Sequence, residues 1–365
     1  MKVLIIGPFP LPLNGMSIAN ENLYHYLNKN SYRVYRHDTV FIKKLKNKNE
    51  QGKFSIYFLL KSIVDSFKCV AKIIKYMPDI VYITPGQSML GFCRYSFIVI
   101  ISRLFRLKLV QHIHGSKLES NYNSANYFLK KIASINIKLT HKFILLGKSI
   151  AEETTIIPYE KIAICDNGVK FIKNDPRYDK KKINVLYLSN LMKDKGIFDL
   201  LDAISIIGDN KKRYSHEFMF HLAGEIEKEY QSKIEKKIKA ISHICYYHGV
   251  VDGEKKHNLL ENSDILILPS YDEGQPLCIL EAYSYSCAVV TTNVGGIRDI
   301  FKDGENGIFC IKNSANSIVN SLNAVLIEIN KYKYNNYILF KNKYSSDIYC
   351  KKIICIFNEV FNVRK

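Results

Sequence analysis

Two glutamates, Glu273 and Glu281, stand at the ends of the string Glu-Gly-Gln-Pro-Leu-Cys-Ile-Leu-Glu. The string directly follows a predicted strand at residues 264–268 and opens a predicted helix. One carboxylate then lies in the loop before the helix and the other on its second turn, so the two can contact different parts of one extended ligand. Acidic residues that merely offset the positive end of a helix would explain one glutamate but not the whole string.

The residues between the two glutamates favour an anionic ligand. Gly274 lets the backbone approach a ligand closely, and Pro276 is tolerated near the first helical turn because its missing N–H has no helical partner there. The N-terminus of a helix presents free N–H groups and a partial positive charge, which suit a phosphate. We therefore expect the string to bind the charged part of a substrate.

This string resembles the signature of the retaining GT-B glycosyltransferases of family 4, the glycosyl transferases group 1. The resemblance implies that Glu273 lies beside the transferred sugar and that Glu281 holds the ribose hydroxyls of a nucleotide-sugar donor. It also implies that the backbone just after Gly274 contacts the sugar and the phosphates. That segment consists of Gln275, Pro276, Leu277 and Cys278. The resemblance covers nearly the whole chain, is tightest over residues 184–310, and continues through the motifs at residues 289–292, 295–297 and 303–307.

A second motif follows the predicted strand at residues 183–188. Members of the family usually carry Gly-Arg-Leu there and end the motif in Lys-Gly, with the Arg and the Lys binding the diphosphate. In this sequence Lys195 matches the lysine, whereas Asn190 replaces the arginine. A neutral amide cannot form the two charge-assisted hydrogen bonds of a guanidinium. Lys193 is a candidate to compensate for the lost charge.

Two positions in the N-terminal half extend the resemblance. Gly15 ends a Pro- and Gly-rich loop after the first predicted strand, where family members bring a glycine backbone to the donor phosphate. The loop is not the dinucleotide-binding Gly-x-Gly-x-x-Gly, which argues against a dehydrogenase. His114 lies at the end of the strand predicted at residues 108–112, just past its last residue, and it matches a histidine whose side chain approaches the sugar 6-hydroxyl. A single histidine at the end of a strand is otherwise more often structural.

No metal ion or other cofactor is expected. The sequence has no convincing Asp-x-Asp motif of the metal-dependent transferases, and its histidines lack the spacing of metal ligands. The charge of the leaving diphosphate would instead be met by Lys195, the helix N-terminus after Gln275 and the backbone of Gly15.

The elements that must position these residues alternate between short β-rich runs and amphipathic helical runs. This alternation predicts an α/β chain whose parallel sheets are covered by helices on both faces. The predicted strands are residues 3–7, 32–37, 79–84, 108–112, 142–147 and 161–166, and then 183–188, 217–222, 244–247, 264–268, 288–292 and 307–310. The predicted helices include residues 17–27, 54–76, 122–139 and 196–207. Residues 169–182 are charged, contain Pro176 and lack apolar periodicity, which indicates a linker.

Two doubly wound, Rossmann-like domains follow in tandem, as in the GT-B fold that the resemblance implies. We expect an N-terminal acceptor-binding domain at residues 1–170 and a C-terminal donor-binding domain at residues 183–340, facing each other across a cleft. A helix at about residues 345–365 is expected to pack back on the N-terminal domain. Ligands of such sheets bind outside the carboxyl ends of the strands.

The chain is strongly basic: its 365 residues include 53 Lys and Arg against 34 Asp and Glu, a net charge of +19. Such a balance indicates a polyanionic partner, unless it reflects a lysine-rich proteome. Residues 43–48 are rich in lysine, and residues 54–75 interleave lysines with apolar side chains. The lysines concerned are Lys43, Lys44, Lys46, Lys48, Lys61, Lys68, Lys72 and Lys75. We expect these segments to dock on an anionic membrane surface; the alternative is a core-packed helix with a solvated face. No nucleic-acid-binding module is recognisable, so nucleic acid is not an expected partner.

The cysteines point to the compartment. The 9 cysteines are scattered without a Cys-x-x-Cys pair, as expected for thiols in a reducing environment. We see neither a secretory signal nor an apolar run of the ~20 residues that span a bilayer. These features predict a cytoplasmic protein that is peripheral on the inner face of the cell membrane.

The resemblance and the charge together predict the function. We expect a retaining hexosyltransferase or N-acetylhexosaminyltransferase that moves a sugar from a UDP- or GDP-sugar to a lipid-linked or saccharide acceptor in bacterial capsule, O-antigen or glycolipid biosynthesis. Two alternatives remain open. One is a catalytically silent partner subunit that binds sugar nucleotides, which Asn190 keeps open. The other is a nucleotide-sugar epimerase on the same fold, against which the string from Glu273 to Glu281 argues.

Overall fold

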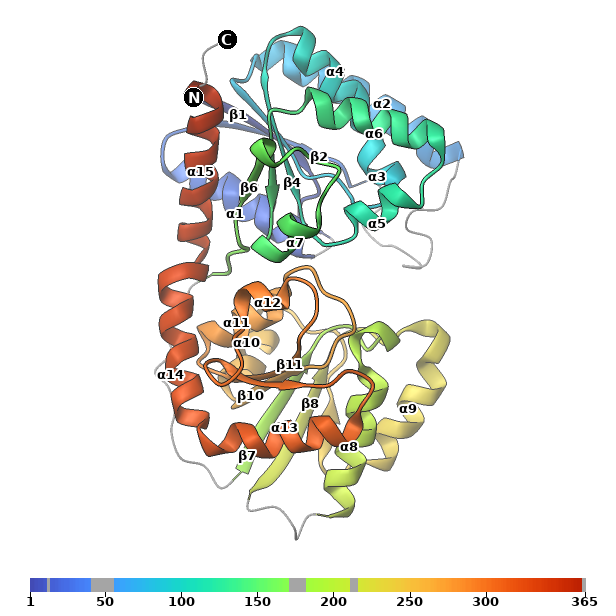
Figure 1. Cartoon of the computed structure of the whole chain (residues 1–365), viewed down its shortest axis with the longest axis vertical. Coiled ribbons are helices and arrows are strands. Elements are labelled where there is room, and N and C mark those ends of the chain that lie inside the picture. Colours follow the sequence, from blue (N-terminus) through green and yellow to red (C-terminus); the bar gives the residue numbers. More distant parts are fainter. Residues whose placement is uncertain (12–13, 41–55, 171–181, 211–215, 363–365) are drawn as a thin grey trace. The chain divides into compact units, whose positions relative to one another are not determined.

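The computed structural model describes residues 1–11, 14–40, 56–170, 182–210 and 216–362 (Figure 1). The lysines at residues 43–48 and most of the predicted linker lie outside these ranges. The chain divides into two units, Met1–Gly168 with Ser346–Lys365, and Val169–Ser345. Each unit is built on a six-stranded sheet in which all paired strands run parallel.

The first sheet has the strand order β2-β1-β3-β4-β5-β6. Its strands are β1 (Lys2–Gly7), β2 (Arg33–Asp38), β3 (Ile80–Ile83), β4 (Lys108–Ile113), β5 (Lys142–Leu145) and β6 (Ile162–Ile164). The helices of this unit are α1 (Gly15–Lys29), α2 (Ile56–Tyr76), α3 (Met89–Cys93), α4 (Ser96–Leu104), α5 (Leu118–Asn123), α6 (Tyr127–Leu139), α7 (Lys148–Glu153) and α15 (Ser346–Asn362), with a 3₁₀ turn η2 (Tyr159–Lys161).

Strand β1 shows how both faces of this sheet are buried. Val3 and Ile5 pack with α1 and α15, whereas Leu4 and Ile6 pack with α2 and α4. Successive side chains of a strand point to opposite faces, so a strand with helices on both sides is apolar at every position. Helix α15, the last of the chain, thus contributes to the core of the first unit, where it contacts α1 and β4.

The helices of this unit differ from the predicted ones at two places. The helix predicted at residues 122–139 is two helices, because Asn126 accepts a hydrogen bond from the N–H of Leu129 at 2.9 Å and so starts a new one, α6, at Tyr127. The apolar run at residues 97–101, which carried no helix prediction, lies within α4.

The second sheet has the order β12-β11-β10-β7-β8-β9. Its strands are β7 (Lys182–Leu188), β8 (Glu217–Ala223), β9 (Cys245–Tyr247), β10 (Ile265–Leu268), β11 (Ala288–Thr292) and β12 (Gly307–Cys310). Its helices are α8 (Ile197–Asp209), α9 (Gln231–Ala240), α10 (Gly253–Glu261), α11 (Leu277–Ser284), α12 (Ile297–Ile300), α13 (Ala315–Ile327) and α14 (Ile329–Leu339), with the short turns η3 (Lys193–Lys195), η5 (Lys228–Tyr230) and the π-helical η6 (Phe340–Tyr344).

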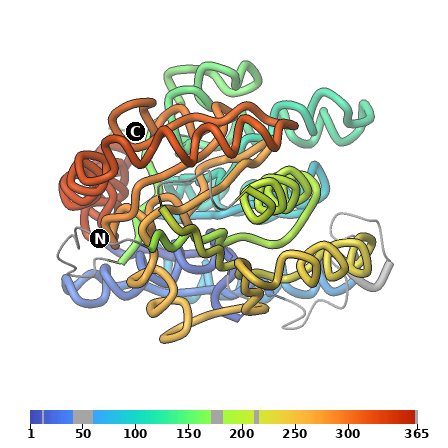
Figure 2. Tube along the Cα trace, turned by 90° about the horizontal axis from the view of Figure 1, so that it is seen from below, coloured from blue at the N-terminus to red at the C-terminus, as the bar shows by residue number. Residues whose placement is uncertain are grey.

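The strand order reverses at β7, as a doubly wound sheet requires. From β7 the sheet extends through β8 and β9 to one edge, and through β10, β11 and β12 to the other edge. Right-handed crossovers then place the two sets of connecting helices on opposite faces. Figure 2 shows α8 between α13 and α9, and α8 contacts both. The predicted α/β architecture with two doubly wound parallel sheets is therefore confirmed, and each predicted strand is present with small shifts at its ends.

Candidate functional site

The string between the two glutamates lies where the sequence predicts, between β10 and α11. Pro276 is the residue that precedes the helix, with φ −69° and ψ 121°, and α11 begins at Leu277. The proline side chain offers no cap to the N–H groups of the first turn, so these donors are suited to an anion. Gln275, two residues before the helix, is buried, and Glu281 lies on the second turn.

Glu273 is held by side chains from two other segments. Its Oε1 accepts a hydrogen bond from the ammonium of Lys195 at 2.6 Å and another from the hydroxyl of Ser270 at 2.8 Å. The carboxylate side chain is 10% exposed and the lysine side chain 26%. The backbone carbonyl of Glu273 accepts the N–H of Gly296 at 3.1 Å. Both the main chain and the side chain of Glu273 are therefore fixed.

Two glycines let the surrounding loops approach one another closely. Gly295 has φ +47°, and a Cβ there would lie 1.9 Å from the carbonyl oxygen of Glu273. Gly196, at the start of α8, has φ +71°, and a Cβ there would lie 2.0 Å from the carbonyl oxygen of Pro269. A side chain at either position would displace backbone beside the Lys195–Glu273 pair.

A second lysine, which the sequence analysis did not single out, pairs with the other glutamate. Lys256 on α10 donates to Oε1 of Glu281 at 2.6 Å, and the two side chains are 28% and 18% exposed. The lysine lies in an ordinary polar helix, so its type and spacing give no signal of its own. Only the packing of α10 beside α11 brings the two residues together.

Cys278 lies on the first turn of α11, and the pKa of its thiol depends on the residues of both ion pairs. Burial raises the pKa of its thiol to about 12, and the carboxylates of Glu273 and Glu281 add to the rise. The ammonium groups of Lys195 and Lys256 oppose it. The predicted site residues of the second unit thus gather around one helix start, each carboxylate with its own lysine.

Asn190 uses its side chain within the protein. Its Oδ1 accepts the N–H of Glu225 at 3.3 Å, and its backbone carbonyl accepts the hydroxyl of Tyr187 at 2.8 Å. Lys193 is exposed, and its N–H donates to Glu227. Among the contacts of the described residues, the two carboxylates of the string pair with Lys195 and Lys256.

His114 and Gly15 belong to the first unit. The ring of His114 stacks on that of His112 with centroids 3.9 Å apart, and His112 shares a 2.7 Å hydrogen bond with the hydroxyl of Tyr82. Burial lowers the pKa of His114 to about 4, against a smaller opposing effect of its hydrogen bond with Asn167. His114 is therefore a neutral imidazole at neutral pH.

Gly15 is the first residue of α1. The side chain of Asn14 accepts the N–H of Ser17 at 2.9 Å, and the hydroxyl of Ser17 accepts the N–H of Asn14 at 3.0 Å. This capping box satisfies one helix donor and leaves the first-turn N–H of Gly15 without a helical partner.

The described residues offer no obvious metal centre. Among them, no group of three or more His, Cys, Asp and Glu side chains is arranged to hold a metal ion. In the same ranges, no helix is long and apolar enough to cross a membrane.

Residues 169–338 match the family model for glycosyl transferases group 1. A relative from Campylobacter jejuni, N,N'-diacetylbacillosaminyl-diphospho-undecaprenol alpha-1,3-N-acetylgalactosaminyltransferase, is 22% identical over 70% of this chain and 71% of its own length. Matches to some other relatives span only 36% to 37% of the relatives' length.

Solved structures show the fold. A glycosyltransferase from Rickettsia africae superposes with a TM-score of 0.76 at 17% identity, covering 100% of this chain and 99% of that one. Anabaena HepE in complex with UDP gives 0.71 at 14% identity, covering 98% and 100%. The predicted two-domain, Rossmann-like GT-B fold is confirmed. The family match and the relatives support a group 1 glycosyltransferase of polysaccharide or glycolipid biosynthesis.

Proposed function

We propose, starting from the group 1 glycosyltransferase match of residues 169–338, that this chain is a retaining, family 4 transferase. It moves a hexose or N-acetylhexosamine from a UDP- or GDP-sugar to a lipid-linked or saccharide acceptor of capsule, O-antigen or glycolipid biosynthesis. One observation carries the proposal: two carboxylates, Glu273 and Glu281, flank the uncapped start of α11, and each is paired with a partly exposed lysine.

The arrangement matches the parts of a nucleotide sugar. The free N–H groups at the start of α11 and the ammonium of Lys195 would bind the diphosphate and stabilise it as the leaving group. Glu281 would accept hydrogen bonds from the ribose hydroxyls. Glu273 would lie beside the transferred sugar. When Lys195 turns to the phosphate, the carboxylate of Glu273 becomes available to the sugar, so one ion pair supplies both contacts.

We assign the sugar-contacting role in the first unit to His114. Because its pKa is about 4, the ring is neutral and has both a hydrogen-bond donor and an acceptor for a sugar hydroxyl. Stacking on His112 fixes the ring plane. A charged imidazolium at this position would offer only donors.

The acceptor is proposed from the relatives and from the surface of the first unit. The name of the Campylobacter relative describes an undecaprenol-linked acceptor, which supports a lipid-linked acceptor here. Such an acceptor resides in a membrane, so the enzyme must work at the membrane surface. We place it on the cytoplasmic face, where nucleotide sugars would meet the acceptor.

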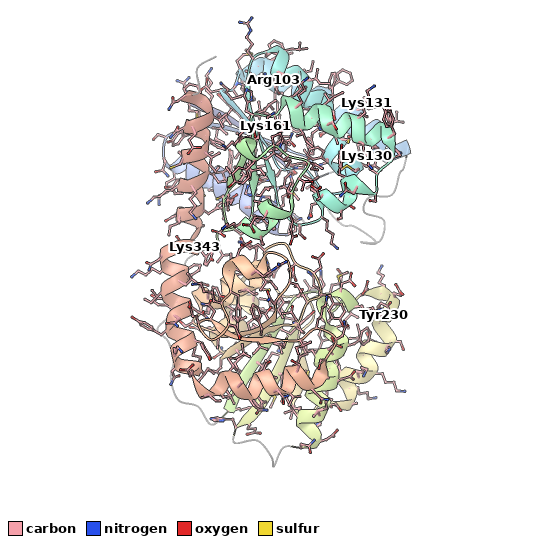
Figure 3. All side chains as sticks on the ribbon, in the orientation of Figure 1. Arg103, Lys130, Lys131, Lys161, Tyr230 and Lys343 are labelled. Atoms are coloured by element: carbon pink, nitrogen blue, oxygen red, sulfur yellow. The ribbon has the colours of Figure 1, made fainter. Side chains whose placement is uncertain are left out.

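Helices α2, α4 and α6 supply a surface suited to that task. They pack side by side (Figure 1), with α4 contacting both neighbours. Their exposed large apolar side chains are Leu60, Ile63, Val64, Phe67 and Ile74 on α2, Phe97, Ile100 and Leu104 on α4, and Tyr127, Phe128 and Ile135 on α6. Lys68, Lys75, Arg103 and Lys131 are exposed on the same helices, and Figure 3 labels Arg103 and Lys131. The outer face of α2 is thus apolar and basic together, which favours anionic lipid over a plain solvated face.

A donor screen tests the proposed reaction. The thermal midpoint of the protein should rise with UDP or GDP and with one of their sugars, because a ligand at ~100 times its Kd stabilises by ~2.7 kcal/mol. Product from that donor, analysed by NMR, should keep the anomeric configuration of the donor. Inversion would contradict the retaining assignment. Binding without turnover across an acceptor panel would instead favour the silent partner subunit that Asn190 leaves open.

A further inference from the structure

We propose that Lys256 is a positioning residue for the donor nucleoside: it holds the carboxylate of Glu281 through Oε1 and leaves the other oxygen to accept from the ribose hydroxyls. This inference rests on the proposed function and extends it to Lys256, which lies outside the string from Glu273 to Glu281. Lys256 comes from α10, and Glu281 from α11.

The two lysines at the string differ in whether their carboxylate has a second side-chain partner. Lys195 shares Oε1 of Glu273 with the hydroxyl of Ser270, so Glu273 keeps a partner when its lysine turns to a phosphate. Glu281 has only the ammonium of Lys256 among the side-chain contacts that the structure resolves for its carboxylate. Its orientation therefore depends on Lys256.

Charge leads to the same assignment. Glu273 and Glu281 both act on the thiol of Cys278, so two negative side chains lie close to one short helix. Asn190 contributes no positive charge to this region, because an amide side chain is neutral. Without Lys256, Glu281 would lose the ammonium that holds its carboxylate, and its orientation toward the ribose hydroxyls would be lost with it. An ion pair at 2.6 Å holds the carboxylate of Glu281 in place.

Partial exposure makes the arrangement compatible with binding. The Lys256 and Glu281 side chains are 28% and 18% exposed, so the pair lies at the surface where a nucleoside can reach it. A fully buried pair would serve only the fold. A fully exposed pair would be too mobile to orient a carboxylate.

The test compares UDP or GDP, whichever wild type binds, with the corresponding nucleoside. The variants are Lys256→Gln, Glu281→Gln and the double variant, with dissociation constants from ligand-observed NMR. Lys256→Gln should weaken both nucleotide and nucleoside by the same factor, roughly tenfold, as for loss of one charged hydrogen bond. In the Glu281→Gln background, Lys256→Gln should have almost no further effect on either dissociation constant. Lys256→Arg should restore most of the affinity, because it keeps the cation.

Lys255→Gln is the matched control, since it removes the same charge from the exposed neighbour on α10. Thermal midpoints of all variants show whether the fold is kept. A loss confined to the nucleotide, with nucleoside binding unchanged, would show that Lys256 contacts the phosphates instead and would overturn the proposal. So would additive effects of the two substitutions. If wild type binds neither nucleotide, the proposed function itself fails, which is a different result.

Discussion

The two glutamates of the string are proposed to do different work, and single substitutions separate their roles. Glu281→Ala should weaken donor binding by roughly 10- to 100-fold, because a partly buried pair of hydroxyls loses a charged acceptor. Glu273→Gln should lower kcat more than it changes the donor KM, because its contact is with the reacting sugar. Steady-state kinetics with saturating acceptor measure both constants. Equal and mild effects of the two substitutions on kcat and KM would contradict this division.

Three partly buried histidines predict a stability that falls in mild acid. Burial lowers the pKa of His114, His141 and His221 to about 4, below the ~6.5 of an unfolded chain. Between these values the unfolded state binds more protons than the folded one. The free energy of unfolding must therefore decrease as pH falls from about 6.5 toward 4.

Urea denaturation at pH 7 and pH 5 measures this loss. His114→Gln should make the loss smaller, because one titrating group is removed. The exposed His243, changed to Gln, serves as the control and should leave the pH dependence as in wild type. An identical loss in wild type and His114→Gln would show that His114 does not contribute.

At the scale of elements, the contact between two loops positions Glu273. Gly295→Ala should destabilise the protein and also lower turnover, because its Cβ would meet the Glu273 carbonyl oxygen at 1.9 Å and push that residue away from Lys195. Gly253 is a close control: its φ is +48° against +47° at Gly295, but a Cβ there meets nothing within 4 Å. Gly253→Ala should show only the cost of the left-handed backbone, about 1–3 kcal/mol. Equal thermal midpoints for the two variants would contradict the steric argument.

The N-terminus of α11 predicts a reaction without a divalent ion. We propose that the N-terminus of this helix and the ammonium of Lys195 stabilise the leaving diphosphate. Purified enzyme should keep its activity in EDTA, and Lys195→Gln should reduce kcat, measured with the same donor. A strict requirement for Mg²⁺ or Mn²⁺ would overturn this prediction.

The elements were largely predictable because parallel strands buried on both faces leave short apolar runs with clear ends. The helix break at Asn126 was missed, since a capping asparagine and an ordinary helical one look alike in sequence. The pairing of Lys256 with Glu281 could not be predicted, because it depends on how two helices pack. The stack of His112 on His114 had a usable signal: residues two apart in a strand share a face.

At the scale of the whole molecule, sequence patterns predict the sheet of each unit but not which side chains are exposed on its surface. The alternation of strands and helices predicts two doubly wound sheets, and the structure has them. A hydrophobic pattern alone does not tell which face of α2 is covered. The structure shows that Cys69 and Ile73 are buried, whereas Leu60, Val64 and Phe67 are exposed. The exposed Lys68 and Lys75 lie on the same helix as these apolar side chains.

This surface predicts binding to anionic membranes. The protein should sediment with anionic but not neutral liposomes, because each lysine near such a surface contributes about 1 kcal/mol. Lys68→Gln with Lys75→Gln should then weaken binding by up to roughly 30-fold at low salt. Binding should also fall with salt, since the Debye length shrinks from ~10 Å at 0.1 M to ~3 Å at 1 M. Replacing the lysines at residues 43–48, which lie outside the described residues, should add to the loss.

Two further variants separate charge from apolar insertion. Lys236→Gln with Lys239→Gln removes the same charge from α9 in the second unit, where both lysines are exposed, and should leave liposome binding almost unchanged. Phe67→Gln, on the exposed face of α2, should remove the part of the binding that persists at 1 M salt, because that part comes from apolar burial rather than from charge. None of these variants should alter the affinity for UDP or GDP, since the residues lie outside the string from Glu273 to Glu281. Equal sedimentation with neutral and anionic liposomes would contradict membrane docking driven by the net charge. The proposed donor chemistry would be unaffected by that result.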